Sequence, residues 1–263
     1  MSTDSTRALL FGIFVLAGRK LTATQVIALA KPLKILATNV KSHLTRMVSD
    51  GSLERSGPVR RAQYWPSQNK AEVVKSIVER LGEGRAEVWD GNWLMLTLRM
   101  PANRAQRERL AAALWFDGFR PIAACTFVRP AWPKRWAIEK AKQYLAPAPG
   151  FCLRGGFVGT FRANEVSSMY GLDSLDREAS RLARWISAKR IPKESAAAAF
   201  AARLEVGGLV ARLVGHDPRL PPAIWGGRTG MRALVRAFRR FEARTAPLAQ
   251  QFLEVVIKGG KAK

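Results

Sequence analysis

Polar side chains between residues 39 and 46 have the types and spacing needed to recognise nucleic acid. They are Asn39, Lys41, Ser42, Thr45 and Arg46. Amide, hydroxyl, ammonium and guanidinium groups hydrogen-bond to base edges and to phosphates, and the natural pairings are Lys41 or Arg46 with guanine and Asn39 with adenine. Apolar residues recur between them at helical spacing, namely Val40, Leu44, Met47 and Val48. The pattern predicts a helix with a buried apolar face and an outward polar face.

A basic hairpin is expected directly after this helix. The pair Asp50-Gly51 predicts the helix end, and residues 53–65 predict two strands around the turn Ser56-Gly57-Pro58. Basic and polar side chains gather on the hairpin, namely Arg55, Arg60, Arg61 and Gln63. Such side chains contact phosphates or the minor groove of duplex DNA. The helix and the hairpin together predict DNA binding.

Upstream elements must hold this helix in place. Residues 5–17 predict a first helix, and Thr22 with Gln25 forms a capping box that begins a second. The second helix must end near Pro32, because proline interrupts helical hydrogen bonding. Residues 34–37 then form a turn. Helices and hairpin of this size predict a winged helix-turn-helix DNA-binding domain over residues 1–68.

The rest of the chain predicts an α+β protein. Residues 69–87 form a connector helix, and residues 88–162 form a ferredoxin-like α+β domain with strands at 93–98, 119–128 and 151–161. Its helices begin after Asn103, ending at Gly118, and at residue 134, with Leu110, Leu114 and Trp115 turned inward. Residues 163–263 form a mostly helical C-terminal domain, with helices at 175–188, 193–213 and 228–244.

The amino-acid composition limits which classes of partner the chain can be expected to bind. The formal charge of +24 favours a polyanion or an anionic membrane surface and argues against an ordinary metabolic enzyme. Hydrophobic residues make up 48% of the chain, which excludes a disordered basic tail. The apolar run 9–17 is too short to span a bilayer, so no membrane partner is expected. Cys125 and Cys152 are interpreted as core thiols, in keeping with a cytoplasmic location.

Catalytic and metal chemistry are not expected. His43 and His216 lie far apart in the sequence, and Asp217 beside His216 is interpreted as part of a His-Asp-Pro turn. The ferredoxin-like unit resembles the fold of small CRISPR-associated metal nucleases, which carry an aspartate at the end of the first strand. Arg99 occupies that position here, and a hard cation needs oxygen ligands. The chain is therefore expected to have no catalytic residues, no metal and no cofactor.

Three segments resemble the PaaX-type family of phenylacetate-catabolism repressors, in the family's order and along nearly the whole chain. They are NVKSHLTRMVSDGSLERSGPVRRAQYWPS, WDGNWLMLTLRMPANRAQRERLAAALWFDGFRPI and HDPRLPPAIWGGRTGMRAL. Ser52 stands where the family prefers tryptophan, and the loop between Pro222 and Trp225 is short. The resemblance implies a dimeric bacterial repressor of a catabolic operon that releases DNA on binding an acyl-coenzyme A or a related aromatic acid thioester. It does not define the effector-binding residues.

We therefore expect a homodimeric repressor that binds a double-stranded DNA operator and responds to a small effector. An RNA-binding or nuclease-like protein that uses the ferredoxin-like unit stays open, as does an enzyme acting on an acyl-coenzyme A. A stripe of arginines near the C-terminus forms a solvated helix face, or contacts DNA flanks or coenzyme A phosphates: Arg232, Arg236, Arg239, Arg240 and Arg244.

Overall fold

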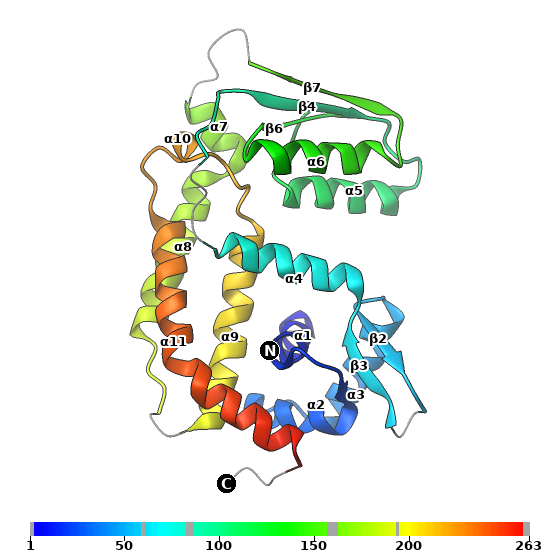
Figure 1. Cartoon of the computed structure of the whole chain (residues 1–263), viewed down its shortest axis with the longest axis vertical. Helices are drawn as coiled ribbons and strands as arrows, with labels where there is room; N and C mark the ends of the chain where they lie inside the picture. The colour runs from blue at the N-terminus through cyan, green and yellow to red at the C-terminus, as the bar shows by residue number, and fades with distance from the viewer. Residues whose placement is uncertain (1–2, 59–60, 83–86, 157–162, 193–194, 260–263) are drawn as a thin grey trace. The chain divides into compact units, whose positions relative to one another are not determined.

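The computed structural model describes residues 3–58, 61–82, 87–156, 163–192 and 195–259 (Figure 1). It mixes helices with two antiparallel sheets, so the expected α+β class is correct at this level. The chain divides into two compact units. The first contains Met1–Leu81, Leu182–Arg212 and Ala233–Lys263, and the second contains Gly82–Arg181 and Leu213–Arg232. The segment 163–263, predicted as one helical domain, contributes to both units.

The first unit begins with helices and a small sheet. The helices are α1 (Thr3–Ala17), α2 (Ala23–Ala30), the 3-10 turn η1 (Lys31–Leu33), α3 (Ala37–Ser49) and α4 (Gln68–Arg80). The strands are β1 (Leu21–Thr22), β2 (Leu53–Ser56) and β3 (Gln63–Pro66) in the order β1-β3-β2. The predicted capping box is confirmed, because Gln25 N donates to Thr22 Oγ1 and Thr22 N donates to Gln25 Oε1.

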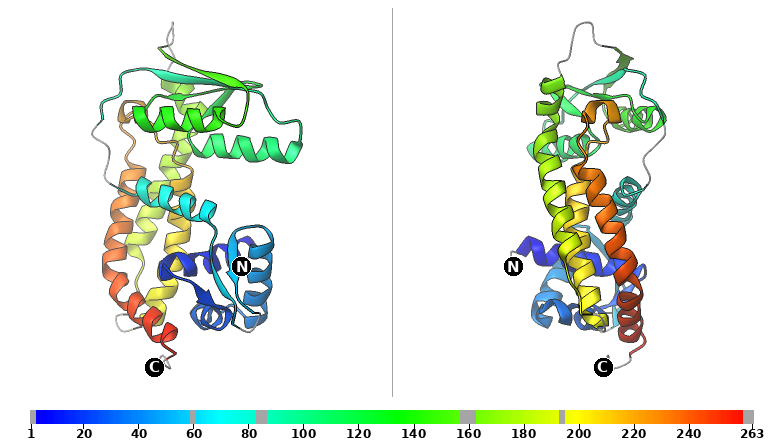
Figure 2. Two further views of the ribbon diagram at one scale, coloured as in Figure 1. Left: turned by 45° about the vertical axis from the view of Figure 1, so that its right-hand side comes forward. Right: turned by 90° about the vertical axis from the view of Figure 1, so that its left-hand side faces the viewer.

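The core of the first unit draws on both ends of the chain. Leu10, Phe14, Leu29 and Leu44 are among its buried residues from α1 to α3. The same core contains buried residues from α9 (Ala196–Gly215) and α11 (Gly230–Ile257), namely Ala199, Phe200, Leu204, Ala249, Phe252 and Leu253. Figure 2 shows α9 and α11 running alongside each other here. The three N-terminal helices are therefore packed against helices that come late in the sequence.

The second unit contains a four-stranded antiparallel sheet with the element order β-α-β-β-α-β. Its strands are β4 (Trp93–Leu98), β5 (Arg120–Ala123), β6 (Thr126–Pro130) and β7 (Gly150–Gly155), in the order β5-β6-β4-β7. Its helices are α5 (Arg104–Phe116) and α6 (Lys134–Leu145), and the Asn103 side chain caps α5. The predicted single strand over residues 119–128 is instead a hairpin of β5 and β6.

The two faces of this sheet carry different layers. Leu94, Leu96 and Leu98 of β4 pack with Leu114 of α5 and Ala137 of α6 on one face. Figure 1 shows these two helices on the same side of the sheet. On the other face, buried residues come from the sheet, from α7 (Ala163–Tyr170) and from the segments that follow it: Trp93, Val128, Val166, Tyr170, Leu172 and Leu220. Helix α8 (Leu172–Ala188) begins at this layer, and the short helix α10 (Pro222–Trp225) lies in the segment predicted as a loop.

Three further expectations are corrected. Trp115 was expected to face inward, yet it is 40% exposed, and its ring contacts His216 (edge-on) and Arg120. Cys125 is exposed and Cys152 only half-buried, since Cys125 lies in the β5–β6 turn. The helix predicted over 228–244 is α11, which continues through Pro247 to Ile257. Within the described ranges, no helix is long and apolar enough to cross a membrane.

Candidate nucleic-acid interface

Helix α3 presents the predicted polar face to solvent. Its buried side is formed by Val40, His43, Leu44 and Met47. The predicted contact residues all lie exposed on the other side, namely Asn39, Lys41, Ser42, Thr45 and Arg46. The Thr45 hydroxyl donates to the Lys41 carbonyl over 3.2 Å, so that side chain offers only its oxygen lone pairs to a partner. The face therefore combines cationic donors with amide and hydroxyl groups.

The hairpin after α3 carries the predicted basic side chains. Strands β2 and β3 pair antiparallel from Leu53↔Pro66 to Ser56↔Gln63. Arg55, Arg61 and Gln63 are exposed, whereas Leu53 is buried in the core of the first unit. Arg60, also predicted as a contact, lies outside the described residues. The turn depends on Gly57, whose φ of 86° is disfavoured for residues with a Cβ atom.

A contact that sequence reasoning missed lies where α3 ends and the hairpin begins. Arg7 of α1 forms a 2.6 Å ion pair with Asp50, and the same guanidinium donates to Ser52 Oγ over 2.7 Å. Ser52 is buried, and its N–H donates to Asp50 Oδ1. Gly51 permits the sharp turn with a φ of 72°. An arginine directly before the apolar run of the first helix was the available signal for this contact.

The ionisation of Asp50 fits this arrangement. Partial burial raises the pKa of its carboxyl, but the hydrogen bonds from Ser52 and the charge of Arg7 lower it more, so the pKa lies below its ordinary value. The aspartate is thus ionised at neutral pH while engaged by Arg7. Its charge is therefore locally compensated, which leaves the exposed cations of α3 and the hairpin to dominate the nearby surface.

A second tie holds the hairpin from its other side. Lys20 Nζ lies 3.8 Å from the ring centroid of Trp65, and Trp65 Nε1 donates to the Glu54 carboxylate over 3.0 Å. Strand β1 also pairs with β3, at Leu21↔Tyr64. The hairpin is therefore joined to the segment between α1 and α2 as well as to α3. The exposed arginines of the hairpin therefore extend from a backbone that is held in place, which suits contacts to regularly spaced phosphates.

Two carboxylates of the second unit, Asp90 and Asp117, have structural partners. Asp90 accepts from Asn92 N and pairs with Arg154. Asp117 is buried and accepts from the Tyr144 hydroxyl. Arg99 is exposed at the end of β4. No group of three or more His, Cys, Asp or Glu side chains suited to a metal is found among the described residues.

The predicted arginine stripe lies on the exposed side of α11. Arg232, Arg236, Arg239, Arg240 and Arg244 are all exposed. The Arg239 guanidinium donates to the Leu81 carbonyl over 2.8 Å, just after α4. This member of the stripe therefore has a structural contact within the first unit.

Comparison with solved structures finds a likeness in fold. The chain resembles a solved structure described as "Uncharacterized protein Rv0674 from Mycobacterium tuberculosis", with a TM-score of 0.54 and 21% sequence identity. The match covers 95% of this chain and 97% of that chain. At this identity the likeness concerns the fold. No family model and no curated protein matches the sequence.

Proposed function

We propose that this chain is a DNA-binding transcriptional repressor with a winged helix-turn-helix in its first unit. The observation that carries the proposal is the exposed polar face of α3, which lies beside a hairpin bearing exposed Arg55 and Arg61. A helix that enters the major groove and a basic hairpin that contacts the backbone form one recognition surface. The charge of +24 supports a polyanionic partner.

In this proposal the protein acts as a cytoplasmic homodimer without catalytic activity. Two copies of α3 enter successive major grooves at half-sites roughly 34 Å apart, or a multiple of that spacing. A small effector favours a second state in which the two helices do not match the half-sites. It shifts the equilibrium only through its different affinities for the two states. The PaaX-type resemblance suggests a catabolic operon and an aromatic acyl-coenzyme A or related effector.

The test is a fluorescence-anisotropy titration of the full chain against duplexes from the region upstream of its own operon. We expect one duplex to bind more tightly than a scrambled duplex of equal length at every salt concentration. With six to ten phosphate contacts, affinity falls about 10³–10⁵-fold between 50 and 200 mM salt. Equal affinity for all duplexes, or a response flat in salt, would contradict specific DNA binding through this surface.

A second candidate function is RNA binding by the ferredoxin-like unit. Phe151 and Leu153 of β7 are 52% and 54% exposed, and they pair with Thr97 and Met95 of β4. Exposed aromatic side chains on such sheets stack against unpaired bases. Competition between the duplex and a structured RNA, repeated with Phe151→Ala, separates the two functions. RNA preference that the substitution abolishes would favour the second candidate.

A further inference from the structure

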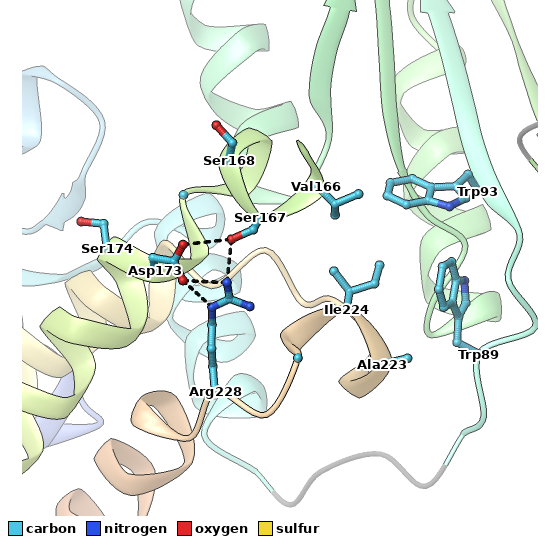
Figure 3. A pocket seen from close by; sticks show the side chains of 12 residues that line it. Trp89, Trp93, Val166, Ser167, Ser168, Asp173, Ser174, Ala223, Ile224 and Arg228 are labelled. Carbon is cyan, nitrogen blue, oxygen red and sulfur yellow. Dashed lines mark hydrogen bonds and ion pairs between the residues drawn. The ribbon is translucent and has the colours of Figure 1, made fainter. Parts of the chain in front are cut away.

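A cavity of about 780 Å³ lies within the second unit. Figure 3 shows Trp89 and Trp93 at one side, and Ser167, Asp173 and Arg228 at the other. Val166 and Ile224 lie between these groups. The volume falls within the range of small-molecule sites, which combine apolar walls with a few polar groups. The lining therefore suits a ligand with an apolar part and a polar end.

The apolar side of the cavity is built from two indole rings. Trp89 and Trp93 have centroids 6.0 Å apart and planes at 78°. Trp93 is buried on β4, and the Trp89 indole N–H donates to the Asn92 carbonyl over 2.8 Å, which fixes that ring. Two rings held nearly at right angles offer one face and one edge to a third ring. This geometry favours a planar aromatic group.

The polar side is a network centred on the guanidinium of Arg228. Its Nε and Nη2 donate to Asp173 Oδ1 over 2.8 and 2.6 Å, and Nη2 also donates to Ser167 Oγ over 2.7 Å. Its Nη1 donates to the Trp225 carbonyl over 3.0 Å. The guanidinium is therefore held from the protein side by Trp225 and Ser167, while Asp173 occupies its carboxylate-binding edge.

The two members of the ion pair differ in their exposure to water. The Arg228 side chain is 22% exposed, whereas that of Asp173 is 64% exposed. The hydrogen bond from Arg228 holds the pKa of Asp173 below its ordinary value, so this carboxylate is ionised at neutral pH. Water can solvate a displaced Asp173 carboxylate at little cost, because that side chain is already mostly exposed. Arg228 retains its need for an anion.

We propose that this cavity binds a planar aromatic carboxylate whose ring packs against Trp89 and Trp93 and whose carboxylate replaces that of Asp173 on Arg228. In the ligand-free protein, Asp173 occupies the position of the ligand's own charged group. Binding is a non-covalent exchange of one carboxylate for another. Affinity is consequently limited by competition from Asp173.

Helices α8 and α11 connect the site of this exchange with the first unit, because both run from one unit into the other. Asp173 lies in the first turn of α8, and Arg228 lies just before α11, whose Gly230 N–H donates to Asp176 Oδ1 over 2.6 Å. The ligand removes one of the ties between the starts of these helices. Both helices continue into the first unit, where α11 ends with the Ile257 carbonyl accepting from Gln25 of α2 over 3.3 Å. The inference that ligand binding lowers operator affinity, called the regulatory half below, rests on the proposed function.

Calorimetry on the full chain with 2-naphthoate tests the site. We expect binding of the acid and much weaker binding of 2-naphthamide, which lacks the charge. Arg228→Gln should weaken naphthoate binding about tenfold or more, the effect of losing hydrogen bonds to a charged group. Asp173→Asn should strengthen it several-fold, because the competing carboxylate is gone. Exposed neighbours on α8 supply controls with matched charge changes, and Arg181→Gln and Glu178→Gln should alter affinity little.

Several outcomes would overturn the inference. Equal binding of the acid and the amide, or weaker binding by Asp173→Asn, would show that Arg228 does not exchange carboxylates. Binding of 2-naphthoyl-coenzyme A without binding of the free acid would show that the cavity takes a thioester instead. If Arg228→Gln fails to fold, Arg228→Lys keeps the charge but loses the paired donors, and it should still weaken binding. Trp89→Ala should weaken naphthoate binding more than acetate binding.

A DNA titration in the presence of naphthoate separates this inference from the proposed function. We expect naphthoate to lower operator affinity of the unmodified chain but not of Arg228→Gln. Naphthoate binding without an effect on operator affinity would overturn the regulatory half alone. Absence of operator binding in the ligand-free protein would overturn the proposed function, while calorimetry would still decide whether the cavity exchanges carboxylates.

Discussion

The guanidinium of Arg7 lies 2.6 Å from the carboxylate of Asp50 and thereby connects the first helix to the end of α3. The same group bonds to the buried hydroxyl of Ser52, the first residue beyond the Gly51 turn. Ser52 also accepts from Ser67 N through its carbonyl, at the end of β3. The position of the hairpin relative to α3 therefore depends on a residue from outside both elements.

Replacing Arg7 with alanine should destabilise the protein by about 1 kcal/mol, because the buried Ser52 hydroxyl loses its partner. The exposed ion pair itself adds little to this value. Operator affinity should also fall, since the hairpin is less firmly oriented. Urea unfolding and anisotropy measure the two effects, with exposed Arg19→Ala as the charge-matched control. Equal losses in both variants would show that the contact has no special role.

The stabilisation from Arg7 should depend on pH in a definite direction. The pKa of Asp50 is lowered in the folded protein, so its contribution is complete above the ordinary value of 3.8 and is lost as pH falls through the lower folded value. The difference in unfolding free energy between the unmodified chain and Arg7→Ala should therefore be constant near neutrality and shrink below about pH 4. Urea unfolding at successive pH values measures this. A difference that grows in acid would contradict the assignment.

Residues on the exposed face of α3 should determine base preference. Arg46→Ala or Asn39→Ala should cost ~1–3 kcal/mol of operator binding and relax the preference at one base pair, if the side chain contacts a base edge. Binding to a panel of single-base operator variants reveals this relaxation. Lys70→Ala, an exposed substitution on α4, should leave the ranking of the panel unchanged. An unchanged ranking in Arg46→Ala and Asn39→Ala would assign both side chains to the phosphates.

Arginines of the hairpin should instead affect the salt dependence of binding. Arg55→Ala or Arg61→Ala should weaken binding to all duplexes similarly and lower the log–log salt slope by about one unit each. The measurement is anisotropy over a series of salt concentrations with operator and scrambled duplexes. Arg184→Ala removes an equal charge from the exposed side of α8 and serves as the control. A slope unaffected by the hairpin variants would place the DNA elsewhere.

The late helices should be required for the stability of the first unit. Phe252→Ala removes a buried ring that lies 5.2 Å from Phe200, and the cavity should cost ~3–5 kcal/mol. Gln251→Ala changes an exposed neighbour and should cost little. Urea unfolding followed by far-ultraviolet circular dichroism compares the two variants. Equal stability would show that α11 packs only loosely against the N-terminal helices.

Local signals in the sequence predicted elements whose ends are set by nearby residues. The capping box of Thr22 and Gln25 predicted the start of α2, and Asn103 predicted the start of α5. Alternation in residues 93–98 predicted β4, and the polar spacing after residue 38 predicted the exposed face of α3. In each case the signal and the structure that it determines lie within a few residues of each other.

Features that depend on distant contacts were not predictable in this way. Proline normally interrupts a helix, yet α11 passes through Pro247. Burial of Ala249, Phe252 and Leu253 in the core of the first unit offsets the hydrogen bond lost at Pro247. No local sequence pattern indicates that these residues belong to that core. The side-chain network of Ser167, Asp173 and Arg228 likewise joins residues that are far apart in the sequence. The spacing of residues in the sequence does not indicate such contacts.

The shared core of the first unit also has a consequence for how the protein is made. A nascent chain emerges from the ribosome N-terminus first, and independent domains generally fold in that order. Here the residues that carry α3 leave the ribosome long before Phe252 and Leu253, which complete the core around Leu44 and Phe14. The core that supports α3 is therefore complete only late in synthesis. Under the proposed function, unfinished chains that lack their C-terminal helices would therefore compete poorly with the mature protein for DNA.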